Sequence, residues 1–144
     1  MKTVSDVLHH TGATNVHWVP PIATVYDAIK IMSDRHVGAL PVIQDRSLVG
    51  IISERDYARK VILKDKSSKT TRVSEIMTPD VITVGRQQRI EECINLMKRH
   101  HIRHLVVMEE GRVVGMVSLR DLFNEIIDEQ AETIHQLEHY IRGQ

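Results

Sequence analysis

The chain has 144 residues, 42% of them hydrophobic, and its 19 basic residues balance its 19 acidic ones. A chain of this length buries roughly two thirds of its unfolded surface, which predicts one globular domain or two small ones. Without net charge, no overall field draws it to nucleic acid or an anionic membrane, so any anion site has to be local. No segment reaches the ~18 uninterrupted apolar residues of a membrane span or resembles a signal peptide, so we expect a cytoplasmic protein.

The first half of the chain predicts five elements. A short apolar strand is expected at residues 16–19, and Thr24 precedes apolar residues at helical spacing. Two short apolar runs, residues 39–43 and 48–52, flank a polar turn and predict a hairpin. A helix is then expected to begin at the string Ser53-Glu54-Arg55-Asp56.

The second half predicts the same order after a polar linker at residues 64–72. A strand is expected near residues 81–84, followed by a helix whose apolar positions include Ile90 and Met97. A hairpin follows at residues 104–108 and 113–117, and the last helix runs from about residue 120 to residue 141. Its apolar stripe has to be covered by the domain or by another chain.

These two halves are a tandem repeat with an offset of 65 residues. This offset relates Gly50 to Gly115, Ser53 to Ser118 and Asp56 to Asp121, and a shared phase this long indicates a duplication. We therefore predict an α+β fold of two strand-helix-strand-strand-helix copies. The expected division is residues 1–63 for the first copy, 64–72 for the linker, 73–123 for the second copy and 124–144 for the C-terminal helix.

The repeated string, Ser53 to Asp56 and Ser118 to Asp121, has two interpretations. The serine can cap the helix while the acidic residue three positions later reaches back, which is a capping box. A strand that delivers a hydroxyl to a helix N-terminus also offers amides to an anion, and the aspartate can bind the two hydroxyls of a ribose. The second interpretation describes a nucleotide site.

The two copies, each closed by G-h-h-S-x-R-D (h, apolar), resemble a pair of CBS domains, named after cystathionine beta-synthase. The resemblance covers residues 4–122, and the ending EQAETIHQLEHYI looks like that of small stand-alone bacterial and plant CBS-pair proteins. It implies that the copies pack through their sheets with pseudo-twofold symmetry. Two clefts between them would take AMP, ATP, NAD or S-adenosylmethionine.

The resemblance also implies which residues form each cleft, because each takes its serine and aspartate from one copy and its adenine-facing groups from the other. For the cleft of Ser118 and Asp121, the matching positions are Thr14, Asn15, His17, Val37, Gly38, Ala39, Arg103 and His104. For the cleft of Ser53 and Asp56, they are Thr78, Ile82, Ile102 and Arg103. The arginines within the strings, Arg55 and Arg120, complete the candidate ligand-binding set.

The two clefts are expected to differ in affinity. Arg103 and His104 match phosphate-contacting positions in the resembled family, whereas the equivalent residues, Gly38 and Ala39, carry no charge. We therefore expect the Asp121 cleft to hold phosphate better, while the Asp56 cleft would borrow Arg55, Arg59 or Lys60. The sequence departs from the family pattern at Pro20-Pro21 and by four extra residues before the first strand, close to Thr14 and Asn15.

Other motifs predict no chemistry. His135-Gln136-Leu137-Glu138-His139 fits a zinc-peptidase string, but a solvated or dimer-facing helix edge explains it better, and no metal is expected. His36 and His101 recur in register and indicate a structural role at a helix end. Cys93 aligns with Ala28 on a helix face, so a core position is favoured over a redox thiol.

The sequence thus predicts a regulatory module that senses an adenosine ligand and acts in trans on a partner protein. We expect no enzyme activity, because no activated nucleophile or acid-base pair can be named. A homodimer is expected, since members of the resembled family usually form such assemblies and the last helix carries an uncovered stripe. The alternative is a scaffold whose serine-aspartate strings are only caps.

Overall fold

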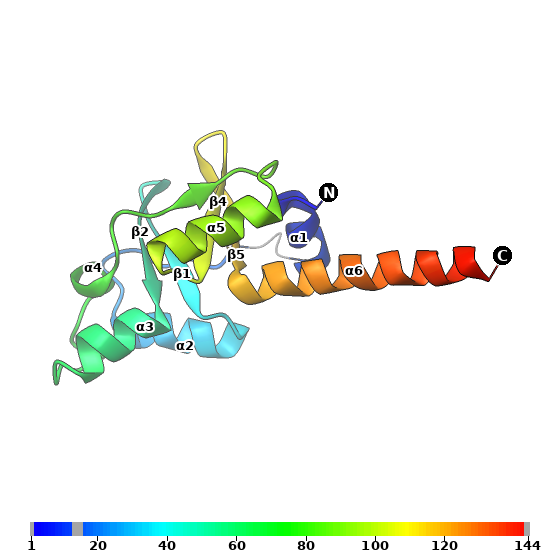
Figure 1. The fold of residues 1–144 in the computed structure, drawn as a ribbon. Helices are drawn as coiled ribbons and strands as arrows, with labels where there is room; N and C mark the ends of the chain where they lie inside the picture. Colours follow the sequence, from blue (N-terminus) through cyan, green and yellow to red (C-terminus); the bar gives the residue numbers. More distant parts are fainter. Residues whose placement is uncertain (1, 13–15, 143–144) are drawn as a thin grey trace.

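The computed structural model describes residues 2–12 and 16–142 and shows a body of helices and two small sheets, from which one long helix extends (Figure 1). Its elements in chain order are α1 (Val4–Thr11), α2 (Val25–Arg35), β1 (Ala39–Gln44), β2 (Ser47–Ser53), α3 (Glu54–Tyr57), η1 (Ala58–Ile62), α4 (Val73–Ile76), β3 (Thr83–Val84), α5 (Ile90–His100), β4 (His104–Glu109), β5 (Arg112–Ser118) and α6 (Leu119–Ile141). The α+β fold predicted from the sequence is confirmed. Within the described residues, no helix is both long enough and apolar enough to cross a membrane.

The two hairpins repeat each other in register. In β1–β2, Val42 pairs with Gly50, and in β4–β5, Val107 pairs with Gly115. Both ladders shift register immediately after these pairs. The 65-residue offset therefore extends to the position of the bulge, and both predicted hairpins are confirmed.

The strand predicted at residues 16–19 does not form as a strand. Val19 makes a single parallel bridge to Val42, whereas β3 pairs with β4 over two residues. Pro20 and Pro21 follow Val19, and proline has no amide hydrogen with which to continue a ladder. The first sheet is consequently reduced to a hairpin with one bridge at its edge.

The first helix of each copy packs on the core of the other copy. Val4, Val7 and Leu8 of α1 belong to the core formed by β3, α5, β4, β5 and α6. Val73 and Ile76 of α4 belong to the core formed by α2, β1, β2 and η1. The predicted division into residues 1–63 and 73–123 follows the chain, but in space the two copies exchange their first helices.

The glycine that opens each string makes room for this exchange. A Cβ added at Gly50 would lie 2.7 Å from Sδ of Met77 and 3.1 Å from the carbonyl oxygen of Thr78. One added at Gly115 would lie 2.8 Å from Cδ2 of Leu8. At both positions the absence of a side chain lets the segment contributed by the other copy lie directly against the strand.

Two histidines end equivalent helices in the left-handed conformation. His36 follows α2 and His101 follows α5, and both have φ 56° and ψ 42°. This confirms their predicted structural role. The predicted core position of Cys93 is also confirmed, because its side chain is fully buried and burial raises the pKa of its thiol to about 11.

α6 packs on the body only over its first turns. Leu122 and Glu125 are buried, and Ile126 packs against the core of the second copy. Every residue from 131 to 142 is exposed, and Figure 1 shows this part of the helix extending away from the body. The body therefore leaves the second half of α6 uncovered.

Candidate functional site

Both serine-aspartate strings are capping boxes. Ser53 Oγ accepts from the Asp56 amide at 3.2 Å, and Asp56 Oδ2 accepts from the Ser53 amide at 2.9 Å. Ser118 and Asp121 make the same pair of bonds at 3.1 Å and 3.0 Å. Each cap uses a single carboxylate oxygen, Oδ2, so the cap and ligand interpretations are compatible.

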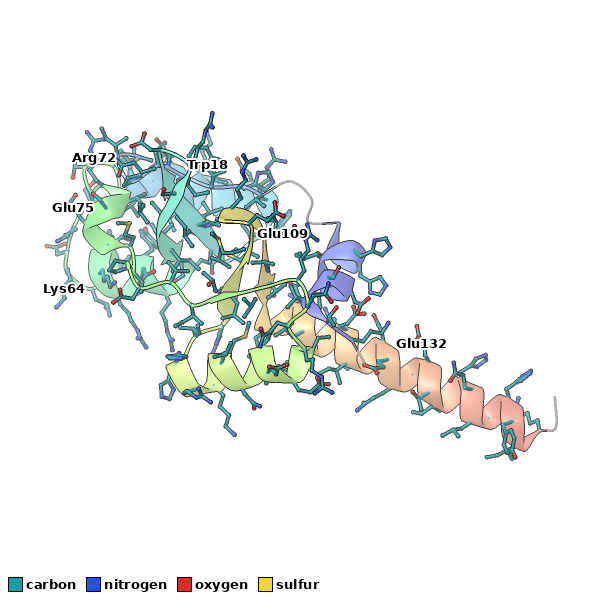
Figure 2. The ribbon with its side chains drawn as sticks, turned by 90° about the horizontal axis from the view of Figure 1, so that it is seen from above. Trp18, Lys64, Arg72, Glu75, Glu109 and Glu132 are labelled. Atoms are coloured by element: carbon teal, nitrogen blue, oxygen red, sulfur yellow. The ribbon has the colours of Figure 1, made fainter. Side chains whose placement is uncertain are left out.

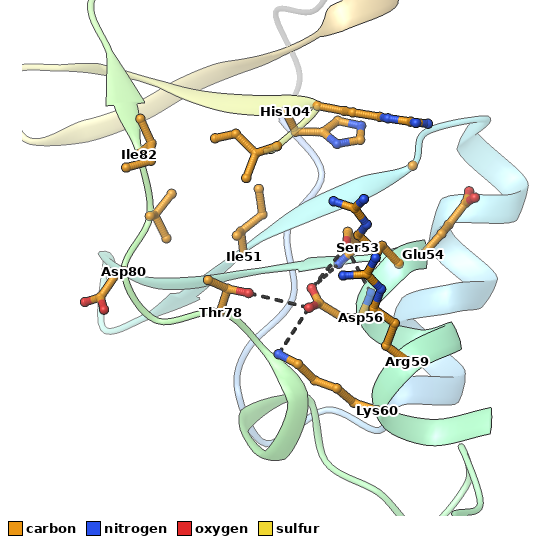
Figure 3. A pocket seen from close by; sticks show the side chains of 15 residues that line it. Ile51, Ser53, Glu54, Asp56, Arg59, Lys60, Thr78, Asp80, Ile82 and His104 are labelled. Atoms are coloured by element: carbon orange, nitrogen blue, oxygen red, sulfur yellow. Dashed lines mark hydrogen bonds and ion pairs between the residues drawn. The ribbon is translucent and has the colours of Figure 1, made fainter. Parts of the chain in front are cut away.

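The second oxygen of Asp56 meets groups from two elements. Lys60 Nζ lies 3.2 Å from Asp56 Oδ1, and Thr78 Oγ1 donates to the same oxygen at 3.5 Å. Thr78 is held in place by two backbone hydrogen bonds with Ile51, both of 2.9 Å. Figure 3 shows Thr78 and Lys60 approaching this carboxylate from different segments. Asp56 is thus presented at a junction between the two copies.

A cleft of about 530 Å³ surrounds Asp56 and draws residues from both copies (Figure 3). Its lining is Gly38, Ile51, Ser53, Glu54, Arg55, Asp56, Arg59, Lys60, Thr78, Asp80, Val81, Ile82, Ile102, Arg103 and His104. All residues expected here from the sequence, Ser53, Arg55, Asp56, Thr78, Ile82, Ile102 and Arg103, lie in this lining. Whether they bind a ligand stays a prediction.

Several lining residues escaped the sequence analysis. Asp80 and Val81 lie between the expected residues Thr78 and Ile82. Their position in the chain, between two predicted cleft residues, could have indicated that they also line the cleft. Ile51 lines the cleft from β2, two residues before Ser53. Glu54 directly follows Ser53, and with Asp56 and Asp80 it makes three carboxylates in the lining.

A wider cleft of about 830 Å³ surrounds Asp121. Its lining is His36, Val37, Gly38, Arg103, His104, Met116, Ser118, Leu119, Arg120, Asp121, Phe123 and Asn124. His17 and Ala39, expected here, are not among the described lining residues, and Ala39 is fully buried within β1. Thr14 and Asn15, also expected here, lie outside the described residues.

Arg103 and His104 line both clefts. Both residues lie where β4 begins, between the two clefts, and a Cβ added at Gly38 would be 3.3 Å from the His104 ring. Because both residues line both clefts, they do not by themselves distinguish the Asp121 cleft from the Asp56 cleft, and the order of affinity expected from the sequence stays a prediction.

The surroundings of His104 disfavour the charged form of its ring. Burial lowers the pKa of its imidazole, with a smaller contribution from Arg103, and Asp121 only partly opposes this shift. A lowered pKa means that the uncharged ring is favoured over the imidazolium. Of these two residues, Arg103 is therefore the main source of positive charge for either cleft.

The helices that contain Asp56 and Asp121 differ in the turn that follows each aspartate. α3 passes into a π-helical turn, η1, whereas α6 remains α-helical. Arg59 and Lys60 belong to this turn, and both line the Asp56 cleft. Wide turns of this kind are frequent at functional sites. The cationic residues expected to serve this cleft, Arg55, Arg59 and Lys60, therefore lie in its lining.

Among residues 2–12 and 16–142, no three His, Cys, Asp or Glu side chains are close enough together to hold a metal ion. His135, Glu138 and His139 are exposed on the free part of α6.

Comparison with known proteins agrees with this architecture. Residues 4–63 and 73–128 match the CBS domain. The chain belongs to the CBS-domain family. It is 38% identical over 149 residues to the mitochondrial CBS domain-containing protein CBSX3 of Arabidopsis thaliana, covering 98% of this chain and 72% of that protein.

Solved CBS-domain structures share the fold. A protein with CBS domains from Burkholderia ambifaria MC40-6 is 42% identical, with a TM-score of 0.86 over 90% of this chain and 96% of that one. The CBS domain pair of protein MJ0100, solved with 5′-methylthioadenosine and S-adenosyl-L-methionine, is 24% identical and has a TM-score of 0.75, covering 90% of this chain and 98% of that one. CBS pairs are generally ligand-binding regulatory modules.

Proposed function

We propose that this CBS pair is a sensor of an adenosine ligand, which binds in the Asp56 cleft and changes the action of the module on a partner protein in trans. The observation that carries this proposal is the position of Asp56. Its Oδ2 is used by the helix cap, while its Oδ1 faces a cleft built from both copies. A ligand here contacts both copies and favours one arrangement of them.

The chemistry of the lining supports a nucleotide. A carboxylate accepts hydrogen bonds from both hydroxyls of a ribose, and charge-assisted bonds contribute about 1.5 to 3 kcal/mol each when buried. Ile51, Ile82 and Ile102 offer an apolar wall for a base. Four cationic side chains suit phosphate groups: Arg55, Arg59, Lys60 and Arg103.

This proposal reverses the order of affinity that the sequence suggested. The Asp121 cleft is wider, and its cationic lining residues are Arg103 and Arg120. The Asp56 cleft is smaller and encloses a ligand more closely, and its lining holds four cationic side chains together with three carboxylates, Glu54, Asp56 and Asp80. We therefore expect the Asp56 cleft to bind first and the Asp121 cleft more weakly.

Fold and composition favour a regulatory module over an enzyme. CBS-domain pairs are typically regulatory, and no lining residue stands out as an activated nucleophile. The complex of MJ0100 with two adenosine compounds supports the class of ligand that this fold accepts. AMP, ATP and NAD are the candidates to test beside S-adenosylmethionine, and a cytoplasmic location stays a prediction.

Thermal unfolding with each candidate ligand tests the proposal. A ligand that binds only the folded state, at 100 times its dissociation constant, adds about 2.7 kcal/mol to the free energy of unfolding. Asp56→Asn is the decisive variant, because its amide oxygen can still accept the cap bond while the charge is lost. Asp121→Asn is the matched control. The expected result is loss of the ligand-induced shift in Asp56→Asn alone.

Two outcomes contradict the proposal. If no adenosine compound shifts the unfolding transition, the strings are caps and the scaffold interpretation holds. If only Asp121→Asn abolishes the shift, the ligand binds in the wider cleft.

A further inference from the structure

Two cations of the Asp56 cleft hold the second copy by hydrogen bonds. Arg55 Nη1 donates to the carbonyl oxygen of His101 at 2.9 Å, and Lys60 Nζ donates to the carbonyl oxygen of Ile76 at 2.9 Å. Both cations belong to the first copy and line the cleft, whereas both acceptors belong to the second copy. We call these two hydrogen bonds the cross-copy bonds.

Both acceptors lie at the C-terminal ends of helices. Ile76 is the last residue of α4, and His101 directly follows α5. The last carbonyl groups of a helix have no partner within the helix, and the helix dipole favours a cation beside them. The first copy therefore supplies cationic caps to two helices of the second copy.

Each acceptor also comes just before a segment that lines the Asp56 cleft. Thr78 lies two residues after Ile76, and Ile102 directly follows His101. The cross-copy bonds therefore fix the starts of two segments through which the second copy reaches the cleft.

An anionic ligand in this cleft competes for the same two cations. A phosphate oxygen is charged and a carbonyl oxygen is not, so a cation binds phosphate more strongly, and arginine can bind it through two parallel hydrogen bonds. Arg55 is exposed and the Lys60 side chain is 44% exposed, so both can turn toward a ligand. A ribose hydroxyl on Asp56 Oδ1 would also meet Lys60 Nζ, which lies 3.2 Å from that oxygen.

The Asp121 cleft lacks this arrangement in the described part of the chain. The 65-residue offset places Glu125 where the first copy has Lys60. Glu125 is 3% exposed, lies 2.7 Å from His10 Nδ1 and is not among the lining residues of that cleft. Arg120 lines the cleft, but no hydrogen bond joins its side chain to the first copy within residues 2–12 and 16–142. A ligand there competes for no such bond.

We propose that Arg55 and Lys60 transmit occupancy of the Asp56 cleft to the second copy. Without ligand they cap α5 and α4, and a ligand phosphate takes them from the two carbonyl oxygens and loosens both helix ends. The inference rests on the proposed function, because it needs an anionic ligand in this cleft. It adds a direction to the response, since binding loosens these helix ends.

α4 presents this change on the surface of the molecule. Val73 and Ile76 are buried, whereas Ser74 and Glu75 between them are exposed. Figure 2 shows Glu75 at the end of the body opposite to the free part of α6, which carries Glu132. A loosened α4 is therefore accessible to a partner protein at that end.

Hydrogen exchange of the full chain without ligand, followed by mass spectrometry, tests the cross-copy bonds. Arg55→Met is expected to speed amide exchange in residues 97–103 by roughly 3- to 10-fold, the effect of one lost hydrogen bond. Lys60→Met is expected to do the same in residues 73–78, and each variant should leave the other segment unchanged. Arg59→Met is the matched control: Arg59 lines the same cleft, and in the described part of the chain it makes no hydrogen bond to the second copy.

The conservative variant Lys60→Arg keeps a cationic donor, so residues 73–78 should exchange at close to the native rate. Native exchange in both Arg55→Met and Lys60→Met overturns the inference. Equal acceleration in Arg59→Met, or in Lys60→Arg, also overturns it, because the effect would then not depend on a cation at the two carbonyl oxygens.

ATP is the probe for the effect of a ligand. In the native chain, ATP that shifts thermal unfolding is expected to speed exchange in residues 73–78 and 97–103 together. Unchanged or slower exchange in these segments with ATP bound overturns the inference. An ATP that shifts neither unfolding nor exchange contradicts the proposed function instead, and the two failures are distinguishable because the ligand-free variants still report the cross-copy bonds.

Discussion

The ammonium group of Lys60 lies 3.2 Å from Asp56 Oδ1 and donates a hydrogen bond of 2.9 Å to the carbonyl oxygen of Ile76. Lys60 belongs to η1 of the first copy and Ile76 to α4 at the start of the second copy. One side chain therefore links the candidate ligand carboxylate to the helix that the second copy contributes. A ligand that binds Asp56 changes the surroundings of this link.

Lys60→Met is expected to weaken nucleotide binding by roughly 3- to 10-fold, because a cation of the Asp56 cleft is lost. The Lys60 side chain is 44% exposed, so the stability of the fold is expected to change by no more than about 1 kcal/mol. Isothermal titration calorimetry measures the affinity. Lys64→Met, in the exposed linker, is the control and should bind like the native chain; equal losses in both variants would contradict a local role for Lys60.

Gly50→Ala is expected to destabilise the chain by about 1 to 3 kcal/mol, because the added methyl group meets Met77 and the backbone of Thr78. Gly85→Ala is the matched control, since a Cβ there meets nothing within 4 Å. Urea denaturation gives both free energies of unfolding. A similar small change in both variants would mean that the exchanged segment moves aside without cost.

His104 is expected to make the fold sensitive to acid. Its pKa is lowered by burial in the folded chain, so below about pH 6.5 the unfolded chain takes up the proton more readily and stability falls. Well above that pH the ring is neutral in both states and contributes no pH dependence. His104→Gln should therefore lose less stability than the native chain between pH 7 and pH 5, as measured by urea denaturation at each pH.

His100→Gln provides the control for this pH dependence, because His100 is exposed at the end of α5. Its stability should follow the native curve. A His104→Gln curve that parallels the native one would show that other groups cause the acid sensitivity.

His36→Gly is expected to stabilise the chain by about 0.5 to 1 kcal/mol, because glycine adopts the left-handed conformation without the steric penalty of a side chain. Arg35→Gly, one residue earlier and inside α2, should destabilise it by a similar amount. Thermal unfolding of the two variants checks this opposite pair of signs. Two shifts of the same sign would contradict the proposed cost at His36.

Much of the local structure could be read from the sequence. The 65-residue offset predicted both hairpins and the helices before them, and the serine-aspartate strings predicted both caps. These features depend on apolar periodicity and on hydrogen bonds within four residues, which a sequence displays directly. The same serine-aspartate strings also made the chain resemble CBS-domain proteins. The match of residues 4–63 and 73–128 to the CBS domain confirms this family.

Only the tertiary structure decided how the copies meet. The exchange of α1 and α4, the presence of Arg103 in both clefts and the lowered pKa of His104 depend on contacts between residues far apart in the chain. A repeat offset aligns equivalent positions, but it does not say which copy an element packs on. The sequence by itself therefore determined the two caps and their aspartates, while packing between the copies decided which charges surround each one.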